Sequence, residues 1–416
     1  MTAEDQTTAH TTPTPADLVG DGPPASARPG RAGNAGRWPA TAVFFLNGLT
    51  LSTYLVRLGS LKDKHHLNDG QLGLVGMVFA LAALACMQGV GPLTARVGTR
   101  PVLRTSLVVM PVLLALVGLA RGPVELVAVI TALGAVHGTT DAAMNTRATA
   151  IEWRLGRPIL NGCHAAWSVS AVVASLATAG LEHAGFSFTT HLLAAAAVLM
   201  AGGLLLGPLL GESGTGDRTH TPAPRRLGRR SGWSRQVVAL GLTGTALMVC
   251  EGAALGWSTI FLHDSRGVSL GLAATAVTAY TGAQAIGRMI GDRLTLRHGA
   301  PALFRTGGLV AACGLTIALL SPNPVAAIGG FAVAGAGASV LIPLAYSAVG
   351  QTKADSLETA TLISRFTTFT YAGTLLGPAA IGWAAELAGL TWTLAALIPV
   401  LCAVALLNRL PGRPQH

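Results

Sequence analysis

The stretch Gly91-Pro-Leu-Thr-Ala-Arg-Val-Gly-Thr-Arg100 has a counterpart later in the chain, Gly291-Asp-Arg-Leu-Thr-Leu-Arg-His-Gly299. Each stretch follows one long apolar run, precedes another, and combines glycine with arginine. Glycine allows a tight turn, and arginine places a permanent charge beside that turn. Two such stretches in equivalent positions predict a chain built from two similar halves.

The whole chain is too apolar and too poor in charge for a protein dissolved in water. Of its 416 residues, 51% are hydrophobic and 11% are charged, and the mean hydropathy is +0.54. A soluble domain has about 25% charged residues, so we do not expect a soluble enzyme. At about 20 residues per membrane-spanning helix, twelve helices need about 240 residues, which this chain can supply.

Twelve apolar runs of spanning length are separated by clusters of Gly, Pro or charged residues. They cover 38-58, 70-92, 102-120, 124-149, 162-180, 188-208, 235-261, 270-291, 303-320, 324-348, 360-384 and 389-408. We therefore predict an all-α integral membrane protein with twelve transmembrane helices in two six-helix bundles. The predicted divisions are a disordered tail at 1-36, bundles at 37-210 and 236-408, a basic cytoplasmic linker at 211-235 and a second tail at 409-416.

The distribution of positive charge predicts the orientation of these helices. With the N-terminus in the cytoplasm, only five of the 28 Lys and Arg residues fall on the outer side, and the other 23 face the cytoplasm. The five are Arg57, Lys62, Lys64, Arg121 and Arg266. This bias follows the positive-inside rule, so both termini are expected in the cytoplasm. The net charge of +10 is then explained by orientation in a cell membrane, and we expect no nucleic-acid partner.

Several kinds of chemistry have no sequence support. There is no Gly-x-x-x-x-Gly-Lys-Ser/Thr phosphate loop, so transport driven by ATP hydrolysis in this chain is excluded. The five cysteines lie singly in apolar stretches, and no Cys/His cluster suggests a metal site. We expect no cofactor and no enzymatic activity.

The paired glycine and arginine stretches resemble the signature loops of the major facilitator superfamily. Further stretches are similar to the fucose-permease-like branch of that superfamily: Asp141–Asn145 with Gly156–Ser168, Glu251–Ser258, Gly287–Arg293 and Pro343–Gly350. The resemblance implies a monomeric secondary transporter that works by alternating access. Two residues depart from the pattern, because Ala95 replaces the usual Asp of the first loop and Asn47 lies in a helix where sugar symporters of the branch carry an acid.

Two acids lie deep inside predicted helices and are our candidates for proton coupling. Ionisable side chains inside a membrane are costly and are usually functional. Glu251 lies about 24 Å along the seventh predicted helix at 1.5 Å per residue, and desolvation favours the neutral form of such a carboxyl group. Asp141 matches the acid-x-x-x-Asn pattern of the resembled branch, where the acid is implicated in coupling. Alternatively, Glu251 locks two helices together, and Asp141 pairs with Arg147 or with an arginine from another helix.

Candidates for a substrate cavity are polar or aromatic side chains within the predicted helices. They are Asn47, Tyr54, His137, Asn145, His164, Trp167, Trp257, Gln284 and Tyr346. His164 and Trp167 are spaced three apart on one helical face, where imidazole and indole groups suit a polyhydroxylated solute. The alternatives are a satisfied interior histidine for His137 and a membrane-interface anchor for Trp167.

Candidates for the gates lie at the predicted cytoplasmic ends of the helices. They are Gly91, Arg96, Gly98, Arg100, Glu152, Arg157, Arg288, Asp292 and Arg293. Glu152 and its neighbouring arginines are expected to form salt bridges between loops that break and re-form as the transporter changes state.

These observations together predict a secondary active transporter that moves a small solute across the cell membrane, coupled to protons. Symport of a sugar-like or other small polar solute is favoured. An efflux antiporter for drugs or metabolites is the alternative, although the Gly-Pro motif that drug antiporters carry in the fifth helix is missing. A membrane sensor on a transporter fold is a rival from another class. The expected partners are the lipid bilayer, the solute and protons.

Overall fold

A computed structural model describes residues 36–67, 69–211, 235–351 and 356–407. The predicted tails, apart from Gly36, and all but the end residues of the predicted linker lie outside the described residues. Regular secondary structure in the described ranges is helical throughout. Helices are expected here, because only a helix or a closed barrel satisfies its backbone hydrogen bonds in lipid.

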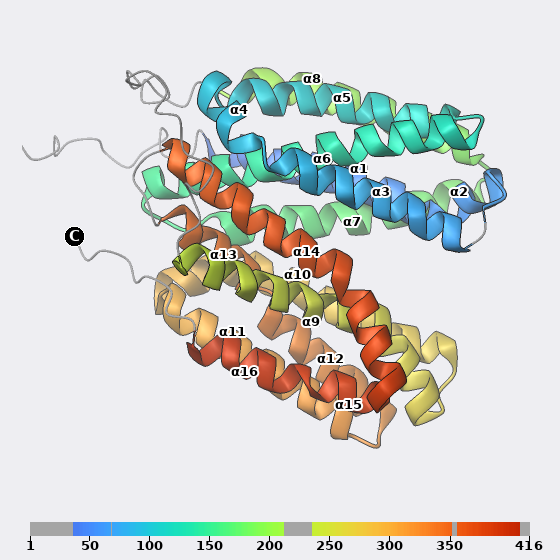
Figure 1. The fold of residues 1–416 in the computed structure, drawn as a ribbon, viewed down its shortest axis with the longest axis vertical. Helices are drawn as coiled ribbons and strands as arrows, with labels where there is room; N and C mark the ends of the chain where they lie inside the picture. The colour runs from blue at the N-terminus through green and yellow to red at the C-terminus, as the bar shows by residue number, and fades with distance from the viewer. Residues whose placement is uncertain (1–35, 68, 212–234, 352–355, 408–416) are drawn as a thin grey trace, which may run out of the picture. The chain divides into compact units, whose positions relative to one another are not determined.

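The described residues of the first half form eight helices, which are labelled in Figure 1. They are α1 (Arg37–Val56), α2 (Leu58–Lys64), α3 (Asp69–Met87), α4 (Val90–Val97), α5 (Thr99–Leu119), α6 (Pro123–Leu155), α7 (Leu160–His183) and α8 (Phe188–Leu209). The second half also forms eight. They are α9 (Arg235–Arg266), α10 (Leu270–His298), α11 (Ala300–Leu320), α12 (Pro324–Ala338), α13 (Leu341–Gly350), α14 (Ser356–Ala388), α15 (Leu390–Ala395) and α16 (Leu397–Leu407).

Nine helical segments of the described chain are long and apolar enough to cross a membrane. The count becomes ten if α3 and α4, whose axes differ by 51°, form one broken span. Two further long helices, α10 and α14, carry more polar residues. Each of the twelve predicted segments coincides with one of these helices or with a consecutive pair, as expected for the predicted twelve-helix architecture.

The two glycine and arginine stretches end their helices in the same way. Gly98 follows α4 with φ of 79°, and Gly299 follows α10 with φ of 81°. Such positive values favour glycine because a Cβ atom would clash with the backbone. Each glycine is also the N-cap of the next helix. The expected tight turns are present at both positions.

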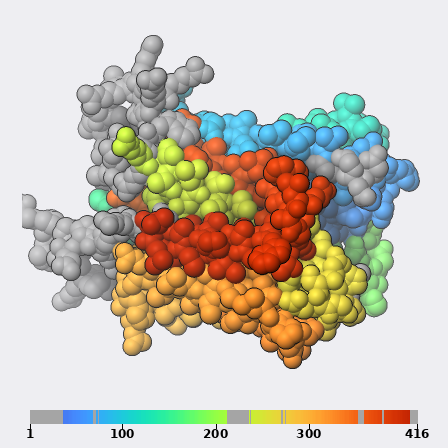
Figure 2. All heavy atoms as spheres, turned by 60° about the horizontal axis from the view of Figure 1, so that its bottom comes forward, coloured from blue at the N-terminus to red at the C-terminus, as the bar shows by residue number. Residues whose placement is uncertain are grey.

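Packing joins neighbouring helices first within each half and then between the halves. In the first half α1 packs on α7, α3 on α6 and α5 on α8, while in the second half α9 packs on α14 and α11 on α12. Between the halves, α7 meets α10, and α14 meets α3, α4 and α6 (Figure 1). Figure 2 shows the second half, in yellow to red, against the blue and green first half.

Large apolar side chains remain on the outside of the helices. Leu205, Leu320 and Leu407 are between 75% and 79% exposed. In water such a surface would drive association, whereas lipid tails solvate it. The exposed apolar surface therefore agrees with a membrane-embedded protein.

Candidate transport site between the two halves

The first N–H groups of α7 bind a carboxylate from their own half. These groups have no partner inside the helix. Glu152, at the end of α6, accepts hydrogen bonds from the main-chain N–H of Ile159 at 2.9 Å and of Leu160 at 3.2 Å. Its carboxylate also hydrogen-bonds Ser347 on α13, in the other half. Glu152 thus binds helix ends and a hydroxyl group, where the sequence predicted a salt bridge between loops.

The next two N–H groups of α7 bind a carboxylate from the opposite half. Asp292 on α10 accepts from the N–H of Asn161 at 3.1 Å and of Gly162 at 3.0 Å. The Arg37 guanidinium lies 3.8 Å from the same carboxylate. The positive end of the helix dipole adds to this attraction. Together Glu152 and Asp292 satisfy all four N–H groups, and Asp292 does so only while the two halves are docked.

Two glycines, one in each of the two glycine and arginine stretches, make further close contacts between the halves. A Cβ atom added to Gly91 would lie 2.7 Å from Thr361 Oγ1 and 3.0 Å from its Cα on α14. A Cβ atom added to Gly291 would lie 2.7 Å from Asn161 Cγ on α7. Because these helices touch at the glycines, both signature stretches lie at a docking surface between the halves.

The remaining gate candidates are placed around this docking surface. Arg96 and Arg293 are exposed, and Arg100 and Arg157 are half-buried. Ala95, which replaces the usual acid of the first signature loop, is also exposed. The carboxylate that docks on the opposite half therefore comes from the second stretch, through Asp292.

Aromatic and polar side chains connect the halves deeper in the molecule. A 2.8 Å hydrogen bond joins His137 Nε2 on α6 to the Tyr371 hydroxyl on α14. The Tyr346 hydroxyl on α13 donates to Thr367 Oγ1 at 3.1 Å, and the ring of Tyr346 lies 5.9 Å from that of His164 on α7. The candidates His137, His164 and Tyr346 therefore lie at one junction between the halves.

Asp141 lies one turn from His137 and has no partner for its carboxylate among the described residues. It is half-buried and within electrostatic reach of Tyr346 and Tyr371. Asn145 uses its Nδ2 atom to bind the Asp141 carbonyl oxygen at 2.9 Å, which leaves Asn145 Oδ1 without a partner.

Arg147, the alternative partner that the sequence suggested for Asp141, makes other contacts. Its guanidinium donates to the carbonyl oxygen of Gly211 at 3.2 Å and to Thr99 Oγ1 at 3.5 Å. Asp141 therefore remains an acid without a cationic neighbour in the described part of the chain.

Glu251, the second deep acid, has a different environment. Its Oε1 atom lies 3.8 Å from Arg288 Nη2 on α10. Arg288 also donates to Ser168 Oγ on α7 at 2.7 Å and to the main-chain oxygen of Ser339 at 3.4 Å. The sequence grouped Arg288 with the cytoplasmic gates, and the structure places it between a deep acid of its own half and a hydroxyl group of the other.

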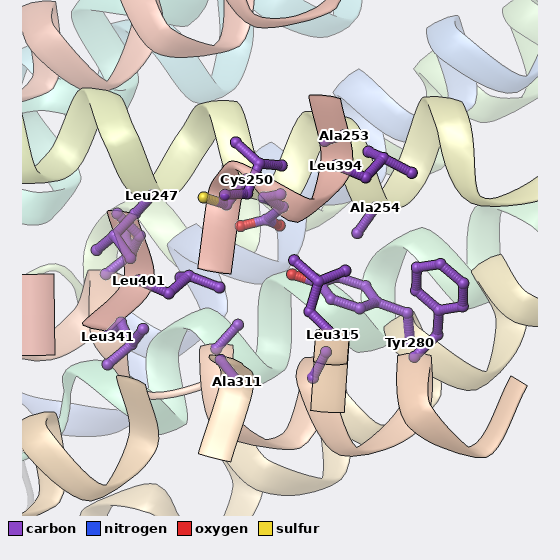
Figure 3. Close-up of a pocket in the computed structure, with 16 residues that line it drawn as sticks. Leu247, Cys250, Ala253, Ala254, Tyr280, Ala311, Leu315, Leu341, Leu394 and Leu401 are labelled. Atoms are coloured by element: carbon purple, nitrogen blue, oxygen red, sulfur yellow. The ribbon is translucent and has the colours of Figure 1, made fainter. Parts of the chain in front are cut away.

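A cavity of about 30 Å³ opens beside Glu251 inside the second half. Leu, Ala, Ile and Phe side chains line most of it, with Cys250 and Tyr280 adding polar atoms (Figure 3). A water molecule needs roughly 10–15 Å³ of such space, so this cavity has room for water and not for a solute the size of a sugar. It lies within one half and is separate from the junction at Asp141.

Several candidate cavity residues carry buried polar atoms without a hydrogen-bond partner. They include both side-chain atoms of Asn47, the Tyr54 hydroxyl, His164 Nε2 and Gln284 Nε2. Buried polar groups are usually paired, so these atoms are available to a polar ligand. The helices carrying them are α1, α7 and α10, of which α7 packs on both of the others.

The two candidate tryptophans pack against other helices. Trp167 lies against Gly48 of α1, and Trp257 lies 3.2 Å from the Cβ position of Gly382 on α14. Trp167 is half-buried, as expected for a residue that contacts protein as well as its surroundings.

Sequence reasoning missed Tyr371 and Thr367, which bind His137 and Tyr346. Tyrosine is rare here, with four in the chain, and one inside an apolar helix was a usable signal. Their pairing with the other half was not readable, because it depends on how the halves dock. Among the described residues, no group of three His, Cys, Asp or Glu side chains is arranged to hold a metal ion.

Comparison with known proteins agrees with this geometry. The family model of the Major Facilitator Superfamily matches residues 40–275 and 241–416. The chain belongs to the major facilitator superfamily. It is therefore a multi-pass protein of the cell membrane, as the sequence predicted.

Relatives within the superfamily are similar over most of their length. An uncharacterised MFS-type transporter of Yersinia pestis is 31% identical over 365 residues, which cover 87% of this chain and 92% of the relative. An uncharacterised transporter of Sinorhizobium fredii is 30% identical over 356 residues, covering 84% and 92%. The crystal structure of the E. coli fucose:proton symporter FucP has a TM-score of 0.70 at 16% identity, covering 90% of this chain and 98% of FucP.

Proposed function

We propose that this chain is a proton-coupled symporter that carries a small polar solute, sugar-like in chemistry, by alternating access. The observation that carries the proposal is the Asp141 carboxylate, which lies at the junction of the halves without a cationic partner among the described residues. The similarity of the fold to a fucose:proton symporter supports the same class of function.

Asp141 is suited to bind a proton because burying an unpaired charge is costly. A carboxyl group in a membrane interior is more stable in its neutral form unless a cation or several hydrogen bonds compensate. When the junction opens to water, that compensation becomes available and the proton can leave. A change in access therefore changes proton affinity at Asp141, which is what coupling requires.

The unpartnered polar atoms on α1 and α10 support a polar solute. Asn47 offers one donor and one acceptor, and Gln284 offers a donor. Tyr346 and Tyr371 add aromatic faces that can cover the apolar face of a sugar ring. Hydroxyl groups of a solute would satisfy polar atoms that the protein leaves open.

The docking surface at the α7 N-terminus supports alternating access. Asp292 holds two N–H groups of the opposite half, and these bonds must exchange for water when the cytoplasmic ends separate. Opening this gate exchanges the two bonds for hydrogen bonds to water, so each contributes only about 1.5–3 kcal/mol net although its acceptor is charged.

The test is transport by purified protein in liposomes that contain a pH-sensitive dye. A panel of sugars, polyols and nucleosides is added outside, with buffered liposomes lacking protein as the control. Symport predicts acidification of the lumen when one of these solutes enters. Alkalinisation of the lumen on the same addition would show antiport, and an unchanged signal with every solute that the protein transports would remove proton coupling.

A further inference from the structure

We infer that Arg288 is a latch between the halves that protonation of Glu251 releases. The inference rests on the proposed proton-coupled transport. It adds the residue, Arg288, through which protonation of an acid in the second half changes a contact with the first half. The evidence is that the Arg288 side chain contacts both Glu251 and the first half.

Arg288 is held by three groups at once. Its Nη2 atom faces Glu251 Oε1 at 3.8 Å, its Nε donates to the Ser339 oxygen at 3.4 Å, and its Nη1 donates to Ser168 Oγ at 2.7 Å. Glu251 and Ser339 belong to the second half and Ser168 to the first. The guanidinium group therefore uses a different nitrogen atom for each of the three groups, which a lysine with its single nitrogen atom could not do.

The guanidinium has one counterion among the described groups around it. Arg288 is 7% exposed, and a charge so buried needs compensation. On α7, His164 also lies within electrostatic reach of Arg288 and brings no negative charge. Loss of the Glu251 charge would therefore leave Arg288 as an uncompensated cation inside the membrane.

Other groups packed around Glu251 do not replace it. On α10 and α9 the neighbours are Tyr280 and Cys250, whose weakly acidic side chains are neutral near pH 7. The cavity surfaces of α11, α12, α13, α15 and α16 are apolar. On α14, Tyr371 binds His137 and Arg365 binds Gln88. Glu251 is the acid that sets the charge balance at Arg288.

The cavity beside Glu251 gives water access to its carboxylate, so a proton can reach it. With room for water next to the carboxylate, a proton can move from water to Glu251 and later return to water. In this step the O–H bond of the Glu251 carboxyl group forms or breaks, and every other covalent bond stays unchanged. Once Glu251 is neutral, Arg288 moves toward water, its bond to Ser168 breaks, and the halves are free to separate.

The position of the latch gives the direction of the effect. Arg288 lies one helical turn before Asp292, which docks on the α7 N-terminus. Ionised Glu251 therefore favours docked cytoplasmic ends, and protonated Glu251 favours separated ends. A transporter that binds a proton from outside would then open toward the cytoplasm.

The experiment measures the distance between spin labels on the cytoplasmic ends of the two halves. Labels are attached at Arg154 on α6 and Arg297 on α10, both exposed, in a variant without the five native cysteines. The wild-type protein is expected to give mainly short distances at pH 8 and a larger long-distance population once the pH is low enough to protonate Glu251. Glu251→Gln should give the long distance at pH 8 as well as at the lower pH.

Ser168→Ala tests the latch without altering any charge. It should raise the long-distance population at pH 8 at least about tenfold, the effect of losing one hydrogen bond to a charged group. Ser170→Ala is the matched control, because Ser170 lies on the same helix and donates to the Trp167 carbonyl oxygen of its own helix. It should leave the distances unchanged.

Two results would overturn the latch. In one, Ser168→Ala gives the same distances as Ser170→Ala at every pH. In the other, Glu251→Gln keeps the full pH response. Either result leaves symport intact if the liposome assay shows proton entry with solute, whereas solute entry without proton movement would remove the proposed function itself.

Discussion

The two deep acids of this transporter lie in opposite halves and have opposite electrostatic environments. Asp141 in the first half has no cationic partner among the described residues, whereas Glu251 in the second half faces Arg288 at 3.8 Å. Burying a carboxylate is costly unless a cation compensates its charge, and of these two acids Glu251 has such a cation among the described residues. We infer from this comparison that the two acids have different roles. Asp141 binds the transported proton, and Glu251 controls a contact between the halves.

Removal of the unpaired acid should have the largest effect. Asp141→Asn keeps the side-chain shape and the neutral state but cannot release a proton. We expect accumulation of solute against a gradient to fall about 100-fold, equivalent to roughly 2.7 kcal/mol, while exchange of solute at equal concentrations persists. Radiolabelled accumulation and exchange in liposomes measure the two activities. The control Glu386→Gln, which alters an exposed acid on α14, should change neither activity. Unchanged accumulation by Asp141→Asn would show that Asp141 does not bind the transported proton.

Removal of the paired acid should reduce coupled transport less than removal of Asp141. Glu251→Gln releases Arg288 permanently, so the cytoplasmic ends separate without a proton. We expect proton-coupled uptake to fall about tenfold, equivalent to about 1.4 kcal/mol, and the remaining uptake to keep only the pH dependence that Asp141 gives it between pH 5 and pH 8. Initial rates of uptake across that range, with size-exclusion chromatography to check folding, make the measurement. Wild-type rates with wild-type pH dependence would make Glu251 a structural residue.

The gate carboxylate should affect speed more than affinity. Asp292→Asn leaves one acceptor oxygen for two N–H groups of α7, and it exchanges a charged acceptor for a neutral one, a loss of about 1 kcal/mol. We expect turnover to slow about fivefold and solute binding to change less than twofold. Stopped-flow uptake and equilibrium binding separate the two quantities. Equal losses in both would place Asp292 at the solute site and not at the gate.

A single methyl group at the docking surface should have the smallest effect. Gly91→Ala places Cβ within 3.0 Å of Thr361 atoms on α14, an overpacking cost of about 1 kcal/mol. We expect the docked state to lose about fivefold in population, which slows transport two- to threefold. Gly76→Ala on α3 is the control, because its Cβ would meet nothing within 4 Å. If both variants transport at the same rate, the contact at Gly91 does not limit the transport cycle.

The fold was largely predictable from the sequence. Apolar runs located all twelve predicted segments, and the paired stretches ending at Arg100 and Gly299 revealed the two halves. The segment predicted over 70-92 is broken between Met87 and Val90, where Gln88 leaves the regular helix and hydrogen-bonds Thr368 on α14. Pro92 has no N–H group to donate to the Gln88 carbonyl oxygen, so the break also had a local signal in the sequence.

The site was less predictable, because residue spacing fixes depth along a helix but not rotation about its axis. Arg288 was assigned to the gate from its depth, and its rotation toward Glu251 follows from the packing of α10 between α7 and α9. The partners Tyr371 and Ser168 likewise depend on how the halves dock. Asp141 and Asn145 were found together because four-residue spacing on one helix is a local property.

The central claim is that Asp141 carries the proton that moves with the solute. The most direct test is the ratio of protons to solute molecules entering liposomes, measured with a pH-sensitive dye and labelled solute in the wild-type protein and in Asp141→Asn. We expect a constant proton-to-solute ratio for the wild type and solute exchange without proton entry for Asp141→Asn. An unchanged ratio in Asp141→Asn would contradict the central claim.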